Sequence, residues 1–347
     1  MGSLPAEIKI PYIKTPCVHS PELSRVTGNI YLKLDNLQPS GSFKSRGIGN
    51  FMSRAIASGP NDVHFYCSSG GNAGLACATS AVALNRPATI VLPTAVSPLI
   101  KEKLLTLGVN VHSVGNAWAQ ADRFLRDELL AHDPSGVYVP PFDHQHVWDG
   151  ASTIVSELRE QLDVPIHGIV CSVGGGGLVN GVIQAVESQP WNGAGGPSTD
   201  TKPTIIAVET EGADSLNASI RAGRHVTLPG ITSIATSLGA SRVSEQTWRW
   251  SQTSKHLVSM TVSDADAAIS CVRFADDARL LVEVSCGATL AVAYRGDLRH
   301  LLGKGLGDDE WAARNVVLEV CGGSGVGLET LAAYREKYGS ESAIKTR

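Results

Sequence analysis

The chain has 347 residues, enough for about two domains of ordinary size and a substantial buried core. Hydrophobic residues make up 43% of it, and 29 basic against 33 acidic side chains give a net charge of −4. A weakly acidic chain without a Lys/Arg-rich run lacks the electrostatic footprint of a protein that binds nucleic acid or an anionic membrane. Glycine is in excess: it accounts for 36 of the 347 residues, about one in ten, where about 7% is usual.

Two features of the sequence bear on its cellular compartment. The first ten residues lack the basic and then apolar pattern of a secretory leader, and no uninterrupted apolar run of about 18 residues predicts a transmembrane helix. The seven cysteines contain no C-x-x-C pair, and their odd number argues against a disulfide framework. We therefore expect a cytoplasmic protein with free thiols.

Short β-branched or apolar runs alternate with longer segments of helical period, which predicts an α/β fold with largely parallel sheets. In chain order, the predicted strands are Ile30–Leu34, Val63–Cys67, Ala88–Leu92, Val109–Val114, Gly168–Cys171, Thr204–Val208 and Val316–Val320. The predicted helices are Lys44–Ser58, Asn72–Leu84, Pro98–Leu107, Ala117–His132, Ala151–Leu162, Leu178–Glu187, Ser263–Asp276, Cys286–His300 and Gly325–Glu336. Ser263 followed by Asp266 resembles a capping box and marks one helix start.

Three glycine-rich turns each follow a predicted strand and precede a predicted helix: Ser68–Gly74, Ser172–Gly177 and Cys321–Gly325. Ligands bind at the carboxyl ends of parallel strands, and helix N-termini present free N–H groups to anions. A single Gly-Gly pair is better explained by an ordinary strand-to-helix turn. Four consecutive glycines at 174–177 indicate a need for bare backbone, because each costs up to about 1 kcal/mol in a helix. These turns predict a phosphate-binding site.

Standard nucleotide signatures do not fit these turns. From Gly174 onward the third glycine of G-x-G-x-x-G is missing, because Val179 or Asn180 occupies its place in the two registers. No G-x-x-x-x-G-K-[ST] occurs in the chain. A dinucleotide or P-loop ligand is therefore not supported.

The segment LDNLQPSGSFKSRG, Leu34 to Gly47, places Lys44 at the start of a predicted helix, where a lysine is usually solvated. This segment is followed in order by SSGGNAG, SVGGGGL and VCGGSG. Together the four motifs closely resemble the fold-type-II pyridoxal phosphate enzymes, and within them the L-serine/L-threonine dehydratase family. The resemblance extends from about Pro11 to about Tyr338, nearly the whole chain.

The resemblance implies a fold of two open three-layer α/β/α domains, with mostly parallel twisted sheets and the cofactor in the cleft between them. Residues 1–37 and 142–347 would form the large cofactor-binding domain, and residues 38–141 the small domain. Related enzymes are dimers, so the resemblance also implies a homodimer with a small amino acid as its substrate.

The resemblance also assigns roles to single residues. Pyridoxal 5′-phosphate would be held by Lys44 as a Schiff base, with Phe43 against its ring and Asn72 on its phenolic oxygen. The thiol of Cys321 would face the ring nitrogen. The phosphate would be held by Gly174, Gly175, Gly176, Gly177 and Leu178, and the substrate carboxylate by Ser68, Ser69, Gly70, Gly71 and Asn72. A monovalent cation, usually K⁺, is implied at Gly174, Glu209, Ala213, Leu238 and Ala240.

The implied reaction is removal of the α-proton by the Lys44 amine followed by β-elimination of water. L-serine would give pyruvate and ammonia, and L-threonine would give 2-oxobutanoate and ammonia. A thiol would not keep the ring nitrogen protonated, which suits elimination better than transamination. Gly70 stands where related racemases commonly carry a serine, and glycine cannot transfer a proton, so racemisation is disfavoured.

Two other hypotheses remain open from the sequence. Glu283 to Thr289 reads EVSCGAT where many such dehydratases read EPACGAA, a difference that bears on the preferred substrate. The second hypothesis is accordingly β-elimination or β-replacement on another β-substituted amino acid, such as threo-3-hydroxyaspartate. The third is a non-catalytic or nucleotide-binding α/β protein.

Overall fold

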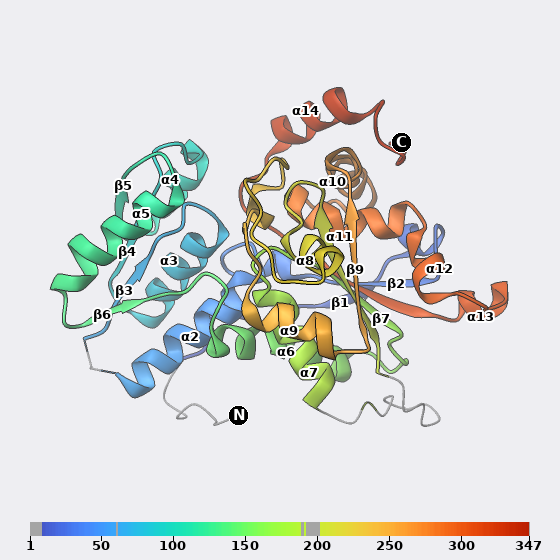
Figure 1. Cartoon of the computed structure of the whole chain (residues 1–347), viewed down its shortest axis with the longest axis horizontal. Helices are drawn as coiled ribbons and strands as arrows, with labels where there is room; N and C mark the ends of the chain where they lie inside the picture. Colours follow the sequence, from blue (N-terminus) through green and yellow to red (C-terminus); the bar gives the residue numbers. More distant parts are fainter. Residues whose placement is uncertain (1–8, 60–61, 189–190, 192–201, 347) are drawn as a thin grey trace. The chain divides into compact units, whose positions relative to one another are not determined.

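The computed structural model describes residues 9–59, 62–188, 191 and 202–346, and the chain divides into two compact units (Figure 1). The smaller unit consists of Met1–Lys14 and Leu37–Ala151, and the larger unit of Thr15–Asn36 and Ser152–Arg347. The domain boundaries expected from the sequence stay a prediction. Within the described ranges, no helix is long and apolar enough to cross a membrane.

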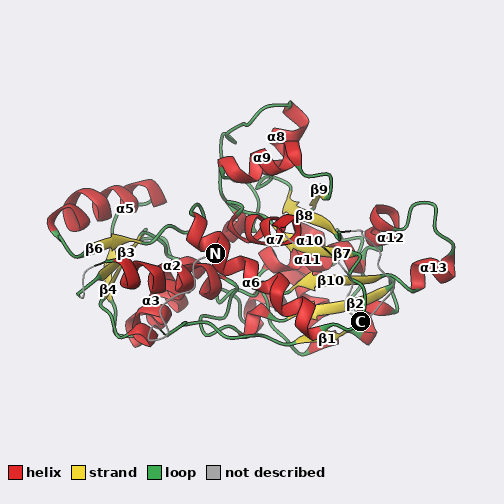
Figure 2. Ribbon diagram, turned by 90° about the horizontal axis from the view of Figure 1, so that it is seen from below, coloured by secondary structure: helices red, strands yellow, loops and turns green. Residues whose placement is uncertain are grey.

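The smaller unit is built on four parallel strands in the order β5-β4-β3-β6. The helix α3 packs against one face of this sheet and α5 against the other (Figures 1 and 2). Because both faces are covered, β4 is buried along its whole length. The strands are β3 (His64–Cys67), β4 (Ala88–Leu92), β5 (Asn110–Ser113) and β6 (Gly136–Tyr138), and the helices are α2 (Lys44–Ser58), α3 (Asn72–Leu84), α4 (Pro98–Thr106) and α5 (Trp118–Phe124).

The larger unit contains a six-stranded sheet in the order β1-β2-β10-β7-β8-β9. Only the β1–β2 pair is antiparallel. The strands are β1 (Cys17–His19), β2 (Asn29–Lys33), β7 (Gly168–Ser172), β8 (Thr204–Thr210), β9 (Leu257–Val262) and β10 (Asn315–Glu319). Since β10, β7 and β8 are parallel neighbours, the turns that follow them lie at one edge of the sheet.

The helices of the larger unit cover both faces of this sheet, with α7 on one side and α11 on the other (Figure 1). The helix α6 (Gln145–Gln161) begins in the smaller unit and ends in the larger one. The others are α1 (Pro21–Ser24), α7 (Gly177–Ser188), α8 (Ser215–Ala222), α9 (Glu245–Thr253), α10 (Asp264–Ala278), α11 (Val284–Tyr294), α12 (Asp297–Leu302), α13 (Asp308–Ala312) and α14 (Leu328–Tyr338).

The α/β architecture with parallel sheets is confirmed, and every predicted strand is present within two residues of its predicted bounds. The helices α2 and α3 have the bounds that the sequence predicted. The cap at Ser263 is also confirmed, since its hydroxyl accepts the Asp266 N–H at 3.0 Å. The sequence did not predict β1, β6, β9, α1, α8, α9 and α13.

Four predicted helices differ from the structure. The helix predicted from Ala151 begins at Gln145, six residues earlier. The segment Ala117–His132 leaves α-helical geometry after Phe124 and continues as a π-helical turn and then a 3-10 turn. The segment Cys286–His300 is two helices, interrupted at Gly296, whose backbone is left-handed with φ +79°. The last helix begins at Leu328 and not at Gly325, because the Gly325 N–H is bound to a Glu283 carboxylate oxygen in the preceding turn.

A buried lysine joins the sheet of the larger unit to α6. Lys33 on β2 has no exposed surface, and its Nζ donates to Glu157 Oε2 at 2.5 Å, to the Thr15 carbonyl at 2.7 Å and to Gln161 Oε1 at 2.9 Å. An ammonium group has three donors, so all of its hydrogen-bonding capacity is used. Removing either charge of such a pair leaves the other uncompensated in the interior.

We predict that Lys33→Met lowers the free energy of unfolding by about 3–5 kcal/mol in urea titrations, because Glu157 then loses its buried partner. The double variant Lys33→Met/Glu157→Leu should recover a large part of that loss, since it removes both charges. Lys304→Met, at an exposed position of the same unit, is the matched control. A Lys33→Met loss no larger than that of the control would contradict this account.

Candidate active site

The four-glycine segment forms the turn between β7 and α7. The strand ends at Ser172 and the helix begins at Gly177. The first N–H groups of a helix have no acceptor within the helix, and the helix dipole makes this end favourable for an anion. Gly176 has φ +97°, a conformation that residues with a Cβ rarely adopt. The turn therefore presents bare backbone N–H groups at the positive end of α7.

The space behind this turn is filled by α9. A Cβ atom on Gly176 would lie 1.9 Å from Thr247 Oγ1, well inside any real contact distance. A side chain at position 176 is therefore excluded by both backbone conformation and packing. This cradle of unsubstituted backbone has the geometry in which main-chain N–H groups can approach an anion closely.

The second glycine-rich turn of the larger unit lies beside the first. The strand β10 pairs in parallel with β7, and Cys321, two residues after β10 ends, has its Sγ 3.5 Å from Ser172 Oγ. A hydrogen bond with Cys286 and burial together raise the pKa of the Cys321 thiol well above its ordinary value of 9.0. The thiol is therefore uncharged at neutral pH.

Glu283, just before α11, fixes the turn that follows Cys321. Its Oε1 accepts the Gly325 N–H at 2.6 Å, and its Oε2 accepts the Ser237 hydroxyl at 2.7 Å. The sequence pattern singled out Glu283 to Thr289 as a departure from the related enzymes but gave Glu283 no role. Its carboxylate ties the Gly322–Gly325 turn to the 3-10 turn Thr236–Leu238.

The two residues that depart from the related pattern, Val284 and Ser285, are buried at the start of α11. Within the described part of the chain, the Ser285 hydroxyl has no hydrogen-bond partner. A buried hydroxyl without a partner costs about 1–3 kcal/mol unless water or a ligand satisfies it. Ser285 is thus a candidate contact for something that the chain itself does not supply.

The residues expected at a cation site converge only in part. Glu209 is the next-to-last residue of β8 and is fully buried, and its carboxylate accepts the N–H groups of Leu216 at 2.9 Å and Asn217 at 2.7 Å. Burial raises the pKa of Glu209 to about 8 despite these bonds. A nearby cation would favour the charged carboxylate, so Glu209 is chemically suited to one.

The remaining candidate cation ligands would act through backbone oxygens. A Cβ on Gly174 would lie 3.1 Å from Leu238 Cα, and the Ala240 N–H donates to the Leu238 carbonyl at 2.7 Å, so these three residues adjoin. Ala213 follows Glu209 in a tight turn, with its N–H on the Thr210 carbonyl at 2.9 Å. No group of three His, Cys, Asp or Glu side chains suited to a metal occurs among the described residues.

In the smaller unit, Lys44 is the first residue of α2, as the sequence predicted. Its Nζ donates to the Pro141 carbonyl at 2.5 Å and lies 5.2 Å from the centre of the Phe43 ring. The side chain is half-buried. The amine is thus held at a defined place at the start of a helix.

The loop Ser68–Gly71 leads from β3 into α3, which begins at Asn72. The Ser69 hydroxyl accepts the Gly71 N–H at 3.3 Å. A Cβ on Gly70 would lie 2.1 Å from a methyl carbon of Val96. Serine or alanine at position 70 would therefore require Val96 to move, which agrees with the expectation that this position carries no proton-transferring side chain.

The hydroxyl of Ser68 is directed to Asp122 on α5. Asp122 Oδ1 accepts the hydroxyls of Ser68 at 2.5 Å and Tyr138 at 2.8 Å, and Oδ2 accepts Arg126 Nε at 2.8 Å. The Arg126 guanidinium lies 3.8 Å from the Tyr138 ring centre. Asp122 and Tyr138 are 54 and 70 residues away from Ser68 in sequence. The sequence analysis missed this anchor, because no local pattern links these three side chains.

The Asp122 network shifts the pKa values of its members. Burial alone would raise the pKa of Asp122, but hydrogen bonds from Ser68, Arg126 and Tyr138 outweigh it and lower the pKa below 3.8. Burial, together with the hydrogen bond to Asp122, raises the pKa of Tyr138 to about 12. The native state therefore favours an ionised Asp122 and a neutral Tyr138.

We predict that Asp122→Asn lowers the free energy of unfolding at pH 7 by about 1–2 kcal/mol, because an amide has no charge and only one acceptor oxygen and cannot accept all three hydrogen bonds. A lowered native pKa contributes stability that is present above the ordinary pKa and is lost as the pH falls through the native one. The difference from wild type should thus shrink as the pH falls below about 3.8. Urea titrations across pH measure it, with the exposed Asp127→Asn as control. A difference that grows on acidification would contradict the assignment.

The structure thus places the predicted site residues in two groups. Lys44, Phe43 and the segment Ser68–Asn72 belong to the smaller unit. The larger unit brings the Gly174–Leu178 loop together with Cys321 at one sheet edge. The smaller unit therefore contains the lysine and the N-terminus of α3. The larger unit contains the four-glycine turn and the Cys321 thiol.

Comparisons with known proteins agree with this geometry. A family model described as "Pyridoxal-phosphate dependent enzyme" matches residues 8–322. The chain is 40% identical to the human "L-serine dehydratase/L-threonine deaminase" over 335 residues, which cover 96% of this chain and 97% of that protein. It is 37% identical to the "L-serine dehydratase" of Saccharomyces cerevisiae over 330 residues, covering 90% and 94%.

Among solved structures, a fungal L-serine ammonia-lyase from Rhizomucor miehei superimposes with a TM-score of 0.85 at 38% identity. The match covers 95% of this chain and 100% of that one. The four ordered motifs, the α/β sheet in each unit and these matches agree with one another. The chain belongs to the family of pyridoxal-phosphate dependent enzymes of fold type II.

Proposed function

We propose that this protein is a pyridoxal phosphate-dependent L-serine/L-threonine dehydratase. It would convert L-serine to pyruvate and ammonia, and L-threonine to 2-oxobutanoate and ammonia. The observation that carries this proposal is the uncharged, buried Cys321 thiol at the sheet edge that also holds the four-glycine cradle. Relatives with this activity match almost the whole chain, which supports the same reading.

The residues present fit the cofactor that this family uses. Pyridoxal phosphate, when bound, supplies an electron sink that makes the α-hydrogen of an amino acid acidic. Lys44 would attach it through its amine, Phe43 would contact its ring, and Asn72 would bind its phenolic oxygen. The N–H groups of Gly174, Gly175, Gly176, Gly177 and Leu178 would hold its phosphate, and Cys321 would face its ring nitrogen.

The chain's own groups would then carry the substrate and its proton. The Ser69 hydroxyl and the free N–H groups at the start of α3 would bind the substrate carboxylate. The Lys44 amine would take the α-proton, for which it must be uncharged. Cys321 carries no charge with which to hold a proton on the cofactor's ring nitrogen, which would suit loss of the β-hydroxyl better than transamination.

A second candidate function rests on Ser285. Its buried hydroxyl, without a partner among the described residues, stands in the segment that differs from many dehydratases of this kind. This observation favours keeping β-elimination or β-replacement on another β-substituted amino acid, such as threo-3-hydroxyaspartate, as the alternative. The substrate assay below separates the two.

We predict that the purified protein with pyridoxal phosphate is yellow and forms keto acid from L-serine and L-threonine, measured by coupled dehydrogenase assay. Lys44→Ala should abolish the visible absorption band of the lysine-bound cofactor and lower keto-acid formation by about 10²–10⁴-fold or more. The control is Lys101→Ala, at an exposed position of the same unit.

The assay has outcomes that would overturn the proposal. Protein that stays colourless with added pyridoxal phosphate would refute the cofactor assignment. Keto acid formed from threo-3-hydroxyaspartate, but from neither L-serine nor L-threonine, would replace the proposed reaction with the alternative. A new amino acid formed only with a thiol co-substrate would point to β-replacement.

We also propose a K⁺ site formed by Gly174, Glu209, Ala213, Leu238 and Ala240, supported by the buried Glu209 carboxylate. K⁺ should raise the thermal unfolding temperature relative to tetramethylammonium at equal ionic strength, because it binds only the native state. Glu209→Gln should remove this difference, and the exposed Glu211→Gln should not. A K⁺ effect of equal size in Glu209→Gln would refute the site.

Two further expectations belong to this proposal. We propose a cytoplasmic location, supported by seven cysteines that are all free thiols in the structure. We propose a homodimer from the resemblance to dimeric relatives, which light scattering of the purified protein would test.

A further inference from the structure

Three buried side chains form a closed hydrogen-bonded ring behind the four-glycine turn. Asn180 on α7 and Thr247 on α9 have no exposed surface, and Ser244, which caps α9, is 3% exposed. Asn180 Nδ2 donates to Ser244 Oγ at 3.0 Å, and the Thr247 hydroxyl donates to Asn180 Oδ1 at 2.8 Å. The remaining contact, Ser244 Oγ to Thr247 Oγ1 at 2.8 Å, closes the ring with Ser244 as donor. Within the ring each side chain therefore donates once and accepts once, and Ser244 Oγ also accepts the Thr247 N–H at 3.2 Å.

This ring contacts the glycine turn at two consecutive residues. The Ser244 N–H donates to the Gly175 carbonyl at 3.0 Å. The Thr247 hydroxyl oxygen fills the space that a Cβ on Gly176 would need. The third member, Asn180, lies in the first turn of α7, and its own N–H donates to the Gly176 carbonyl at 2.9 Å. The ring thus touches the turn from behind and the helix that the turn begins.

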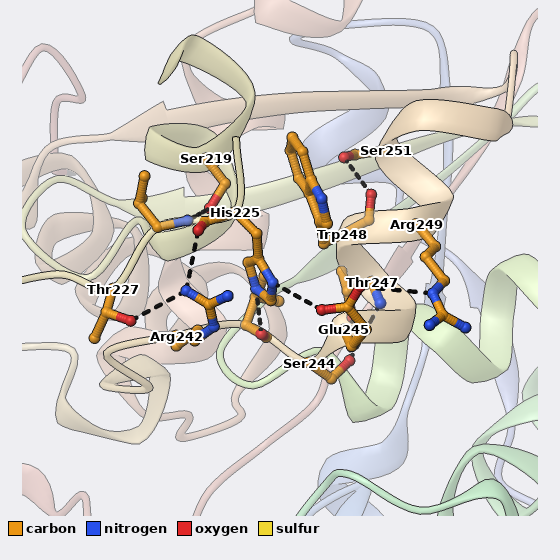
Figure 3. Close-up of polar contacts among 12 residues, drawn as sticks. Ser219, His225, Thr227, Arg242, Ser244, Glu245, Thr247, Trp248, Arg249 and Ser251 are labelled. Carbon is orange, nitrogen blue, oxygen red and sulfur yellow. Dashed lines mark hydrogen bonds and ion pairs between the residues drawn. The ribbon is translucent and has the colours of Figure 1, made fainter. Parts of the chain in front are cut away.

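A second set of contacts holds the start of α9 from outside, as Figure 3 shows. His225 lies with Nε2 2.8 Å from the Val243 carbonyl and Nδ1 3.1 Å from Glu245 Oε2, on either side of Ser244. Its ring stacks on Trp248, with centroids 5.8 Å apart and planes 12° apart. Arg242 donates to the His225 carbonyl at 3.0 Å. Ser244 is thereby held by the buried ring on one side and by the largely buried His225 side chain on the other.

We propose that the Asn180–Ser244–Thr247 ring is a positioning device for the phosphate of the cofactor, with His225 as its outer clamp. None of these side chains is assigned to the ligand itself. They hold Gly175 and Gly176 in the one conformation that points the N–H groups at a dianionic phosphate monoester. The inference rests on the proposed cofactor role of the turn and deepens it.

The physical reason is preorganisation. A turn of four glycines has more conformational freedom than any other four residues, so ordering it on binding would weaken affinity. A satisfied buried polar ring has one arrangement, and losing one member leaves the other two with unpaired buried groups. The ring therefore fixes the turn before the phosphate arrives.

The test is cofactor affinity of the apoprotein, followed by fluorescence, with pyridoxal phosphate and with pyridoxal, which lacks the phosphate. Thr247→Val keeps the shape but removes the hydroxyl, and should weaken pyridoxal phosphate binding by about 10-fold to 100-fold. Its affinity for pyridoxal should stay within about twofold of wild type, since that ligand does not use the turn. Thr247→Ser, which keeps the hydroxyl, should restore most of the loss.

The matched control is Thr253→Val, which removes an exposed threonine hydroxyl from the same helix. It should leave both affinities unchanged. If Thr247→Val does not fold, the affinities for pyridoxal phosphate and pyridoxal are compared in His225→Asn instead. This variant should weaken pyridoxal phosphate binding by about 3-fold to 10-fold.

Several results would overturn the inference. One is a folded Thr247→Val protein that binds pyridoxal phosphate as tightly as wild type. Another is an equal loss for pyridoxal phosphate and pyridoxal, which would mark a general destabilisation. A wild-type protein that binds neither compound would refute the proposed function itself. If wild type binds pyridoxal phosphate normally and Thr247→Val binds it equally well, only the proposed role of the ring is refuted.

Discussion

The structure of the larger unit depends on how closely α9 approaches the turn between β7 and α7. The Thr247 hydroxyl occupies the volume that any side chain at Gly176 would need. Bare backbone is the consequence, and with it a row of N–H groups at the start of a helix. An anion can then come as close to the main chain as hydrogen-bond geometry allows. The position of α9 therefore determines what the turn can bind.

This arrangement also explains why a phosphate site needs no basic patch in a chain with a net charge of −4. In the proposed site, the charge of a phosphate would be met by N–H dipoles and the end of a helix. At the same sheet edge, hydrogen bonding and burial keep the Cys321 thiol neutral. This thiol therefore adds no negative charge beside a bound dianion.

Much of this site was predictable because its elements are local in sequence. A strand, a glycine-rich turn and a helix N-terminus follow one another within about 15 residues, and periodicity detects each part. The bounds of α2 and α3, and hence the places of Lys44 and Asn72, were correct for this reason. The segment Ala117–His132 has a helical pattern too, but a π-helical turn after Phe124 has no signature in residue type.

The features that the sequence did not predict are polar elements and contacts between residues far apart in the chain. The helix α9 reads EQTWRWSQT, a short and mostly polar segment without the apolar content by which the longer helices were predicted. Its partner Asn180 is 67 residues from Thr247, so the ring between them exists only in three dimensions. The nearest local signal was Ser244 three residues before Thr247, the spacing of a helix cap. The Asp122 anchor of Ser68 is hidden in the same way, since its partners lie on different elements.

The requirement for glycine at positions 70 and 176 consequently comes from residues outside the glycine-rich motifs. Position 70 is bare because a methyl group of Val96 fills the adjoining space, and position 176 because Thr247 does. In both cases the partner is more than 20 residues away and belongs to no recognisable pattern. A motif such as SSGGN or GGGG thus contains the glycine of such a contact but not the residue that the glycine packs against. A substitution at either glycine requires a matching change at Val96 or Thr247, so the chemistry open to this chain is set as much by those two residues as by the motifs themselves.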